Sequence, residues 1–147
     1  MIVLCDMDHT LSDAAWRDHL IPNWEEYYED AHLDEPIIPM ILMVNALAEA
    51  GHSVVVLTAR GEKWRKKTQN WLIRHGVRAD DVLMRPEGNY MSSPDLKVRL
   101  AKDKFNKDLY RFQGVELVID DRADVCSAFR ALGIPTLQTT YARGGKE

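Results

Sequence analysis

Two aspartates, one residue apart, follow directly after a short apolar segment at the start of the chain. Asp6 and Asp8 come after Ile2–Cys5, in the stretch "MIVLCDMDHTLSD". Successive side chains of an extended segment alternate, so these two carboxylates are expected to point the same way. A second acidic pair, Asp120 and Asp121, follows another apolar segment late in the chain. An oxygen-only set of this kind, with no histidine or cysteine among its members, is typical of a site for a hard ion, above all Mg²⁺.

Such a cluster of carboxylates is unfavourable without a bound cation or a bound proton. Two of them about 4 Å apart repel each other by roughly 4 kcal/mol at an effective dielectric constant near 20. Raised pKa values or a cation must compensate for this repulsion. A calcium-binding EF-hand loop is excluded, because Leu11 occupies the position that needs glycine and Arg17 the position that needs glutamate. We therefore predict a Mg²⁺ site made by four acids: Asp6, Asp8, Asp120 and Asp121.

Further polar residues in the chain are suited to hold a phosphoryl group at this site. Thr58 follows the apolar segment Ser53–Leu57, and Lys97 lies near the start of a predicted helix. A hydroxyl, an ammonium group and a divalent ion together would neutralise the oxygens of a phosphoryl group. Asp6 is then the candidate nucleophile, giving an aspartyl-phosphate, and Asp8 the candidate general acid and base. Three further lysines on the same predicted helix are alternatives to Lys97: Lys102, Lys104 and Lys107.

The elements that must position these residues alternate between strands and helices. Five segments rich in Val, Ile and Leu predict buried parallel strands: Ile2–Cys5, Ser53–Leu57, Asp81–Met84, Glu116–Ile119 and Thr136–Thr139. Four segments predict helices: Pro36–Ala50, Glu62–His75, Pro94–Lys107 and Ala123–Leu132. This order indicates an α/β fold with a Rossmann-like, doubly wound parallel sheet. Ligands of such sheets bind outside the carboxyl ends of the strands, where the polar clusters fall.

Length and charge limit the possible functions. The 147 residues fit one domain, 1–147, in which residues 12–35 form a small cap-like insertion after the first strand. The net charge of −4 argues against a groove that follows many phosphates, although a few arginines suffice for one terminal phosphate. Cys5 and Cys126 are not in metal-binding spacing, and neither a secretory signal nor a membrane span is visible. We expect a reduced, cytoplasmic and soluble protein.

Aromatic residues are concentrated in the insertion, which contains Trp16, Trp24, Tyr27 and Tyr28. Two interpretations stay open for these side chains: packing inside the insertion, or stacking on a nucleobase beside the site. The helix predicted after Glu62 places Trp64 and Trp71 on one face, where we expect both to pack in the core. The basic run from Lys63 to Lys67 is expected to be a solvated helix face.

Four motifs together resemble those of the haloacid dehalogenase (HAD) superfamily of phosphotransferases. They are "DMDHT" with Asp6, Asp8 and Thr10, "LTAR" with Thr58, the single Lys97, and "VIDDR" with Asp120 and Asp121. Each motif is weak alone, but their order and their positions after predicted strands make the resemblance specific. The chain also resembles the 3′-phosphatase domain of phage-type polynucleotide kinase/phosphatase, through "SDAAWRDHL", "TARGEKWRKKTQNWLIRHGV", "LMRPEGNYMSSPDLK" and "IDDRADVCSAFRALGI".

This resemblance implies substrate-binding roles for Thr10, Arg17 and Arg60, in addition to the catalytic residues. The sequence departs from the family at His9, where glycine is usual, and at Ser93, where an acid is usual and for which Asp95 is a nearby substitute. The approach to Lys97 also departs, because Gly88-Asn89-Tyr90-Met91 lacks an acid and an arginine of the family pattern.

The resemblance implies a Mg²⁺-dependent phosphatase that removes a 3′-phosphate from nucleic-acid or nucleotide ends. The ATP-binding motif GxxxxGK[ST] of a kinase does not occur in the sequence. The similar run Gly144-Gly145-Lys146 is not followed by a predicted helix, so we expect no kinase activity. One alternative is a small-molecule nucleoside monophosphatase with the same catalytic residues. A second alternative, a catalytically silent binding protein with this fold, would be expected to have lost a motif carboxylate, and none is lost.

Overall fold

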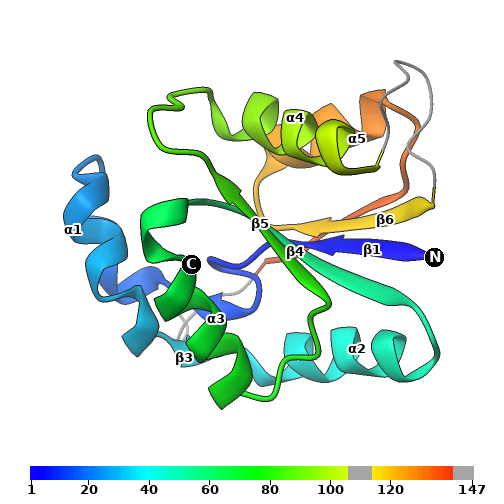
Figure 1. Cartoon of the computed structure of the whole chain (residues 1–147), viewed down its shortest axis with the longest axis horizontal. Helices are drawn as coiled ribbons and strands as arrows, with labels where there is room; N and C mark the ends of the chain where they lie inside the picture. Colours follow the sequence, from blue (N-terminus) through cyan, green and yellow to red (C-terminus); the bar gives the residue numbers. More distant parts are fainter. Residues whose placement is uncertain (106–113, 141–147) are drawn as a thin grey trace.

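The apolar segments form a five-stranded, all-parallel sheet with the strand order β5-β4-β1-β6-β7 (Figure 1). This computed structural model describes residues 1–105 and 114–140. Its strands are β1 (Ile2–Cys5), β4 (Ser53–Gly61), β5 (Asp81–Arg85), β6 (Val115–Asp120) and β7 (Thr136–Gln138). The predicted sheet is confirmed, with strand ends that differ by a few residues. Lys107 and the segment Gly144-Gly145-Lys146 lie outside the described residues.

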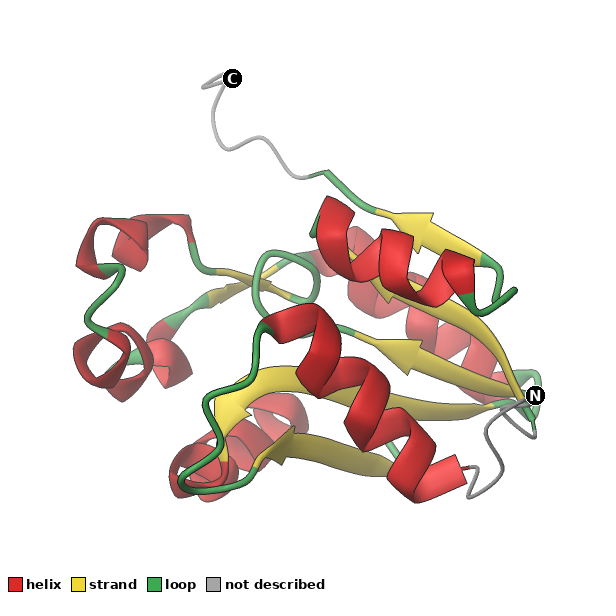
Figure 2. Cartoon of the chain, turned by 90° about the horizontal axis from the view of Figure 1, so that it is seen from above, coloured by secondary structure: helices red, strands yellow, loops and turns green. Residues whose placement is uncertain are grey.

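Helices cover both faces of the sheet, because the strands carry apolar side chains on both sides (Figure 2). They are α2 (Ile38–Glu49), α3 (Arg65–Arg74), α4 (Ser93–Phe105) and α5 (Ala123–Ala131). Val3 and Val56 pack on the side of α2 and α3, in one core cluster with Trp71. Leu4 and Val118 pack on the opposite side, in a second cluster with Phe129 of α5. The doubly wound arrangement brings the carboxyl ends of β1, β4, β5 and β6 to one edge.

Strand β4 is longer than the sequence predicts, and its extension matters for the site. Its pairing with β5 is regular as far as Leu57 and resumes only at Gly61. Thr58, Ala59 and Arg60 therefore lie in an irregular end of the strand instead of following it. The strand was predicted from its apolar residues, and the extension was missed because it contains polar side chains. An irregularity of this kind changes the direction in which side chains point, as β-bulges beside active sites commonly do.

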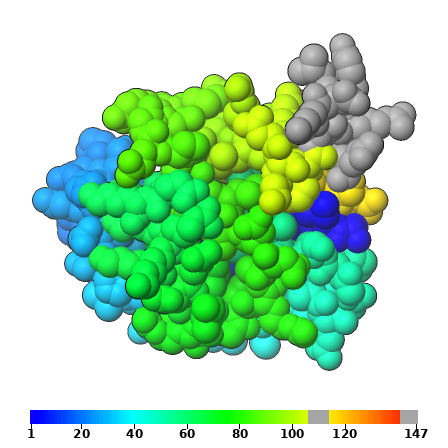
Figure 3. Space-filling view, in the orientation of Figure 1, coloured from blue at the N-terminus to red at the C-terminus, as the bar shows by residue number. Residues whose placement is uncertain are grey.

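The insertion between β1 and α2 is held at its base by a short antiparallel pair, β2 (Ser12–Asp13) and β3 (Glu35–Pro36). Beyond this pair it contains the 3₁₀ helix η1 (Ala15–Leu20), helix α1 (Trp24–Glu29) and the 3₁₀ helix η2 (Ala31–Leu33). Figure 2 shows the insertion projecting from the carboxyl edge of the sheet. In the space-filling view it lies against the green segment that contains α3 (Figure 3). None of the described helices is long and apolar enough to cross a membrane.

Candidate active site

A buried lysine joins two of the predicted acids at the carboxyl edge of the sheet. Lys97 Nζ donates to Asp6 Oδ1 at 2.7 Å and to Asp120 Oδ2 at 2.6 Å. Lys97 is 2 % exposed although it is a lysine, so its charge depends on these carboxylates. Among the described alternatives, Lys104 instead pairs with Asp81 on the surface. The structure thus brings Lys97 of α4 to the ends of β1 and β6, as the sequence predicted.

Asp121 completes a group of three acids around this lysine. One carboxylate oxygen each from Asp6, Asp120 and Asp121 lies within 4.8 Å of the other two. Burial raises the pKa of Asp6 to about 7, although the Lys97 ammonium group opposes the shift. Burial likewise raises the pKa of Asp120 to about 6, with the Asp6 charge adding to it. Three ionised carboxylates and one ammonium group would leave two negative charges uncompensated, which fits an oxygen-coordinated divalent cation.

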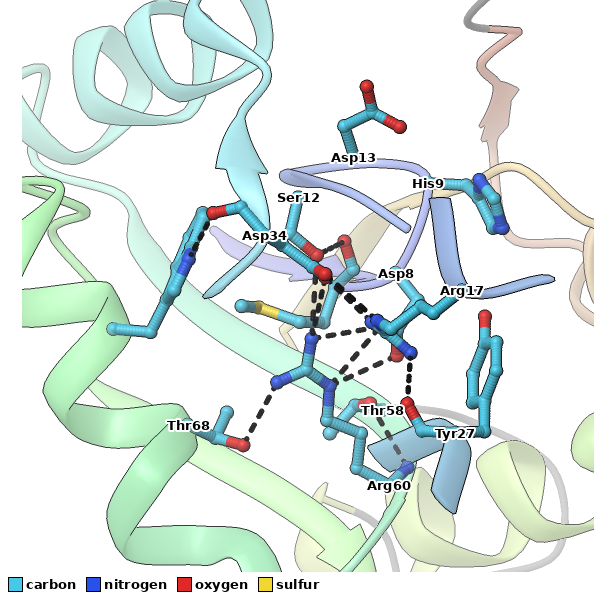
Figure 4. A network of polar contacts seen from close by, with 12 residues as sticks. Asp8, His9, Ser12, Asp13, Arg17, Tyr27, Asp34, Thr58, Arg60 and Thr68 are labelled. Atoms are coloured by element: carbon cyan, nitrogen blue, oxygen red, sulfur yellow. Dashed lines mark hydrogen bonds and ion pairs between the residues drawn. The ribbon is translucent and has the colours of Figure 1, made fainter. Parts of the chain in front are cut away.

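The carboxylate of Asp8 contacts different partners (Figure 4). Arg60 of β4 donates from Nη2 to Asp8 Oδ1 at 2.8 Å and from Nε to Asp8 Oδ2 at 3.1 Å. Arg17 of η1 donates from Nη2 to the same carboxylate. Burial opposes ionisation of Asp8, but the charges of Arg60 and Arg17 outweigh it and hold the pKa of Asp8 well below its usual range. Asp8 is therefore an ionised carboxylate in this arrangement.

Asp34, at the end of the insertion, is the second acid of this arginine network, and sequence reasoning missed it. Arg17 donates from Nε to Asp34 Oδ1 at 2.8 Å and from Nη2 to Asp34 Oδ2 at 2.6 Å. Arg60 Nη2 also lies 3.5 Å from Asp34 Oδ2. Two arginines thus face two carboxylates, so this cluster is electrically balanced, unlike the cluster around Lys97. No local motif marks Asp34, because its contact with Arg17 spans 17 residues.

Arg17 and Arg60 are buried rather than open to a ligand. Arg17 is 0 % and Arg60 is 1 % exposed. Arg17 also donates from Nη1 to the carbonyl oxygen of Tyr27 at 3.0 Å, and Arg60 donates from Nη1 to Thr68 Oγ1 at 3.2 Å. Their contacts show that they hold Asp8 and the insertion in place. Direct contact of these arginines with substrate stays a prediction.

The remaining predicted residues lie around the nucleophile loop. Thr10 Oγ1 donates to Asp6 Oδ2 at 3.2 Å, so Thr10 orients the carboxylate of Asp6. Thr58 is fully buried, and its hydroxyl accepts a hydrogen bond from the backbone of Arg60 at 3.1 Å. Asp13 accepts a hydrogen bond from the backbone of Ala15 at 3.1 Å, beside the start of η1.

His9 adopts a left-handed backbone conformation, with a φ of 63°. This conformation explains the glycine that is usual at the corresponding position, because a Cβ atom is strained there. Histidine itself does not predict a positive φ, although the usual glycine is consistent with one. The His9 side chain reaches the insertion, where Nε2 lies 2.9 Å from Asp18 Oδ1.

Ser93 and Asp95, in the first turn of α4, are not members of the described acid groups. Asp95 is exposed, and its backbone donates to Ser92 Oγ at 3.4 Å. Within the described residues, Asp121 of the chain's second acidic pair supplies the third carboxylate of the cluster. A role for Asp95 as substitute for the missing family acid stays a prediction.

The aromatic residues of the insertion pack on one another and on Trp64. Tyr28 lies 6.0 Å from Trp24 in a stacked arrangement and 5.3 Å from Trp64, measured between ring centroids. Trp71 is buried as predicted and donates from Nε1 to the carbonyl oxygen of Asp34 at 2.9 Å. The prediction for Trp64 is wrong, because this side chain leaves the core and contacts the insertion. Its indole also donates to Glu29 Oε2 at 3.3 Å.

The basic run after Gly61 contacts the insertion as well. Lys63 pairs with Glu25, and Lys67 Nζ lies 3.0 Å from Glu29 Oε1. These side chains are exposed, as expected for a solvated face, but they also join α3 and the residues just before it to α1. The ion pairs and the ring contacts with Trp64 together fasten the insertion beside the site.

A doubly wound sheet with these acids at its carboxyl edge has the architecture of a HAD-fold phosphatase. Residues 1–143 match the family described as "Polynucleotide kinase PNKP phosphatase domain". The chain therefore belongs to this family of the HAD superfamily, and the resemblance seen in its motifs is confirmed. A search of curated proteins found no significant match.

Solved structures agree with this assignment. A chain of the "Pnkp1/Rnl/Hen1 RNA repair complex" is 26% identical, with a TM-score of 0.82, over 97% of this chain and 43% of that chain. A second structure of that complex gives 27% identity and a TM-score of 0.77, over 96% and 46%. This chain thus spans less than half of the length of either. A predicted phosphatase from Clostridium acetobutylicum shares the fold, at 15% identity and a TM-score of 0.69, over 96% and 85%.

Proposed function

We propose that this protein is a Mg²⁺-dependent phosphomonoesterase that removes a 3′-phosphate from nucleic-acid or nucleotide ends through an aspartyl-phosphate on Asp6. One observation carries the proposal: three carboxylates lie within 4.8 Å of one another, a buried lysine pairs with two of them, and two negative charges are left uncompensated when all three are ionised. Such a cluster is costly for folding alone, and it is suited to a cation and a phosphoryl group. Membership of a phosphatase family supports the same reaction.

The residues present fit a divalent ion. Asp6, Asp120 and Asp121 offer only oxygen atoms, which is the ligand type that Mg²⁺ prefers. A bound ion would neutralise charge on the oxygens of the phosphoryl group. Asp8 as a fourth side-chain ligand stays a prediction, because in this structure its carboxylate binds two arginines.

The proposed reaction has two steps at phosphorus. In the first, a carboxylate oxygen of Asp6 forms a bond to phosphorus while the bond to the leaving oxygen breaks, and that oxygen takes a proton from Asp8. In the second, Asp8 takes a proton from water, the water oxygen attacks phosphorus, and the bond to Asp6 breaks. Lys97 and the Thr58 hydroxyl would hold the phosphoryl oxygens, since the hydroxyl only accepts from the backbone of Arg60 and keeps its own proton to donate.

The contacts of Asp8 suit one of these steps more than the other. With two guanidinium groups beside it, Asp8 is ionised and ready to accept a proton. To donate a proton in the first step, its carboxyl group must leave Arg17 and Arg60 and become protonated. We infer that substrate binding shifts Asp8 from the arginines toward the leaving oxygen. Before substrate binds, Arg17 and Arg60 act as positioning residues for Asp8.

The identity of the substrate rests on the family. The matched chains of the RNA repair complexes support a nucleic-acid end, although this chain spans less than half of them. The insertion is proposed as a small cap of a single domain, leaving space for a polymer end. A nucleoside monophosphatase remains the second candidate, because it would use the same catalytic residues.

A substrate comparison with one matched pair of variants tests the proposal. Purified protein with Mg²⁺ is expected to release phosphate from a 3′-phosphorylated oligonucleotide faster than from its 5′-phosphorylated counterpart. Asp6→Asn should abolish turnover, whereas Asp103→Asn, on an exposed acid that pairs with Arg99, should not. Equal rates on free mononucleotides would favour the second candidate. No hydrolysis of any monoester, or an active Asp6→Asn variant, would refute the proposed function.

A further inference from the structure

The arginines expected to read the substrate are already occupied by acids. Arg17 and Arg60 are buried, and between them they bind Asp8 and Asp34. Part of a substrate beyond the scissile phosphate would therefore need another contact at this edge of the sheet. A cation with free donors and a neutral hydroxyl are suitable groups.

Arg85 is such a cation. It is the last residue of β5, so it lies at the same carboxyl edge as the ends of β1 and β4. Its guanidinium is fixed by backbone oxygens: Nε donates to Ala59 at 3.1 Å, and Nη1 donates to Met91 at 2.7 Å and Asn89 at 3.3 Å. No described carboxylate forms an ion pair with Arg85, and its Nη2 donates to no described residue. A half-buried, preorganised guanidinium without a counter-ion is suited to bind an anion.

Tyr28 supplies a hydroxyl to the same region. It lies on α1 of the insertion, and its ring is fixed between Trp24 and Trp64. The guanidinium carbon of Arg17 lies 6.0 Å from the Tyr28 ring centroid, and Nη2 of the same group donates to Asp8. Trp64, which contacts the Tyr28 ring, also lies against Gly61, and Gly61 of β4 is the residue that pairs with Arg85 of β5. Among the described residues, none forms a hydrogen bond with the Tyr28 hydroxyl.

We propose that Arg85 and Tyr28 form a subsite that binds a second phosphate group of the substrate, next to the phosphate that is removed. Figure 1 shows α1 on the side of the molecule toward which the carboxyl end of β5 points. The inference rests on the proposed function, since it assigns the part of the substrate that the catalytic residues do not contact. The second phosphate is either the neighbouring phosphodiester of a polynucleotide or a further monoester of a nucleotide.

Nearby acids do not cancel the positive charge of this subsite. Glu25 and Glu29 of α1 are paired with Lys63 and Lys67 respectively. Glu62 is bound by Arg65 through two hydrogen bonds of 2.6 Å each. Each of these acids thus has its own cation. Glu87, two residues after Arg85, is exposed, and among the described residues it forms no ion pair with Arg85.

Three substrates separate this subsite from the catalytic cluster. They are a nucleoside 3′-monophosphate, which has no second phosphate, a nucleoside 3′,5′-bisphosphate, and a 3′-phosphorylated dinucleotide. For the wild-type protein, we expect at least one of the two substrates with a second phosphate to have a KM about tenfold lower than that of the 3′-monophosphate. A tenfold change is the effect of one hydrogen bond to a charged group. Whichever of these two has the lower KM identifies the source of the second phosphate.

Tyr28→Phe and Arg85→Gln should each raise the KM of the preferred substrate about tenfold and leave its kcat within about twofold. The KM of the 3′-monophosphate should hardly change. Tyr90→Phe and Arg74→Gln are matched controls on exposed residues and should leave all three KM values unchanged. Tyr28→Phe keeps the ring and should keep the wild-type Tm, so this variant still tests the subsite if Arg85→Gln does not fold. Equal losses on all three substrates, or no wild-type preference, would overturn the subsite.

A binding measurement separates the subsite from the proposed reaction. A dinucleoside monophosphate has the internal phosphate but no phosphate to be removed. Its binding to Asp6→Asn protein should change the fluorescence of Trp24 and Trp64, which contact Tyr28. The added Tyr28→Phe substitution should weaken this binding about tenfold. If no monoester is hydrolysed but this binding is observed, the proposed function fails and the subsite stands; absence of binding contradicts the subsite.

Discussion

His9 is the single described residue other than glycine that has a positive φ. A side chain in this conformation costs about 1–2 kcal/mol relative to an unstrained residue. The His9 side chain gains one contact in this conformation, since Nε2 lies 2.9 Å from Asp18 Oδ1. The two side chains are 28% and 44% exposed, so this contact adds little to the free energy of unfolding. The turn would thus accept glycine at lower cost.

At this residue, His9→Gly should raise the free energy of unfolding by about 0.5–1 kcal/mol, because relief of strain exceeds the added entropy of the unfolded chain. Urea denaturation measures the change. Asp18→Ala is the control, since it removes the same contact, together with a 3.4 Å contact from the Tyr27 hydroxyl, without altering the turn. If His9→Gly destabilises more than Asp18→Ala does, the strain is not the dominant effect.

Asp6 provides a second prediction at the residue scale. Its folded pKa of about 7 lies above the ordinary value of 3.8, so between these pH values the folded chain keeps a proton that the unfolded chain releases. Stability from this group is therefore lost as pH rises through that window. In chelator, Asp6→Asn should have a higher Tm than wild type at pH 8 and a similar Tm at pH 4. A lower Tm of the variant at pH 8 would show that the charge pair with Lys97 dominates.

At the scale of elements, one arginine fixes the insertion to the sheet. Arg17 of η1 bonds to Asp8 after β1 and to Asp34 before β3, so it holds both ends of the insertion. The exposed pairs of Lys63 and Lys67 hold the outer side, where ion pairs are weak. The insertion is therefore fastened strongly at its base and weakly at α1.

Arg17→Ala should lower the free energy of unfolding by about 3–5 kcal/mol, because Asp34 and Asp8 lose a buried partner. Arg17→Lys should recover only part of this loss, since one ammonium group cannot replace the forked contact with Asp34. Lys63→Ala, just before α3, is the control and should change stability by about 0–1 kcal/mol. Chemical denaturation compares the three variants; similar losses for Arg17→Ala and Lys63→Ala would contradict this account.

For the whole molecule, charge is unevenly divided between two neighbouring clusters. Arg17 and Arg60 balance Asp8 and Asp34, whereas Lys97 leaves two charges of its three acids uncompensated. The pKa values follow this division, with Asp8 lowered and Asp6 raised. Environments that separate the pKa values of two carboxyls are typical of sites with divided acid, base and nucleophile roles.

Mg²⁺ should therefore stabilise the folded protein, and more at pH 8 than at pH 5.5. With pKa values of about 7 and about 6, Asp6 and Asp120 carry protons at the lower pH that a cation must displace. Thermal unfolding with and without Mg²⁺ measures the shift, with Na⁺ at equal ionic strength as control. A larger shift at pH 5.5 would exclude these two acids as ligands.

Much of the fold and of the acid cluster was predictable from the sequence. Apolar runs marked the strands, and the rule that ligands bind at their carboxyl ends placed Asp6 and Asp120 at one edge. Lys97, which pairs with both, was chosen from its place near the start of a helix and from the family resemblance. The arginine network was not predictable, because Asp34 has no motif and Arg60 lies in a strand end with polar side chains. Trp64 was misplaced for a related reason. Helical spacing cannot show that an insertion distant in sequence covers one face of the helix.

The covalent role of Asp6 is tested most directly by trapping its intermediate. Asp8→Asn protein lacks the proposed base for the second step but can still react with an ester whose leaving group needs no proton, such as p-nitrophenyl phosphate. After reaction with Mg²⁺ and an acid quench, peptide mass spectrometry should find one added phosphoryl group on the peptide that contains Asp6. The same treatment of Asp6→Asn protein should find none. Release of p-nitrophenol without phosphorylation of that peptide, or a phosphoryl group on another residue, would contradict the proposed mechanism.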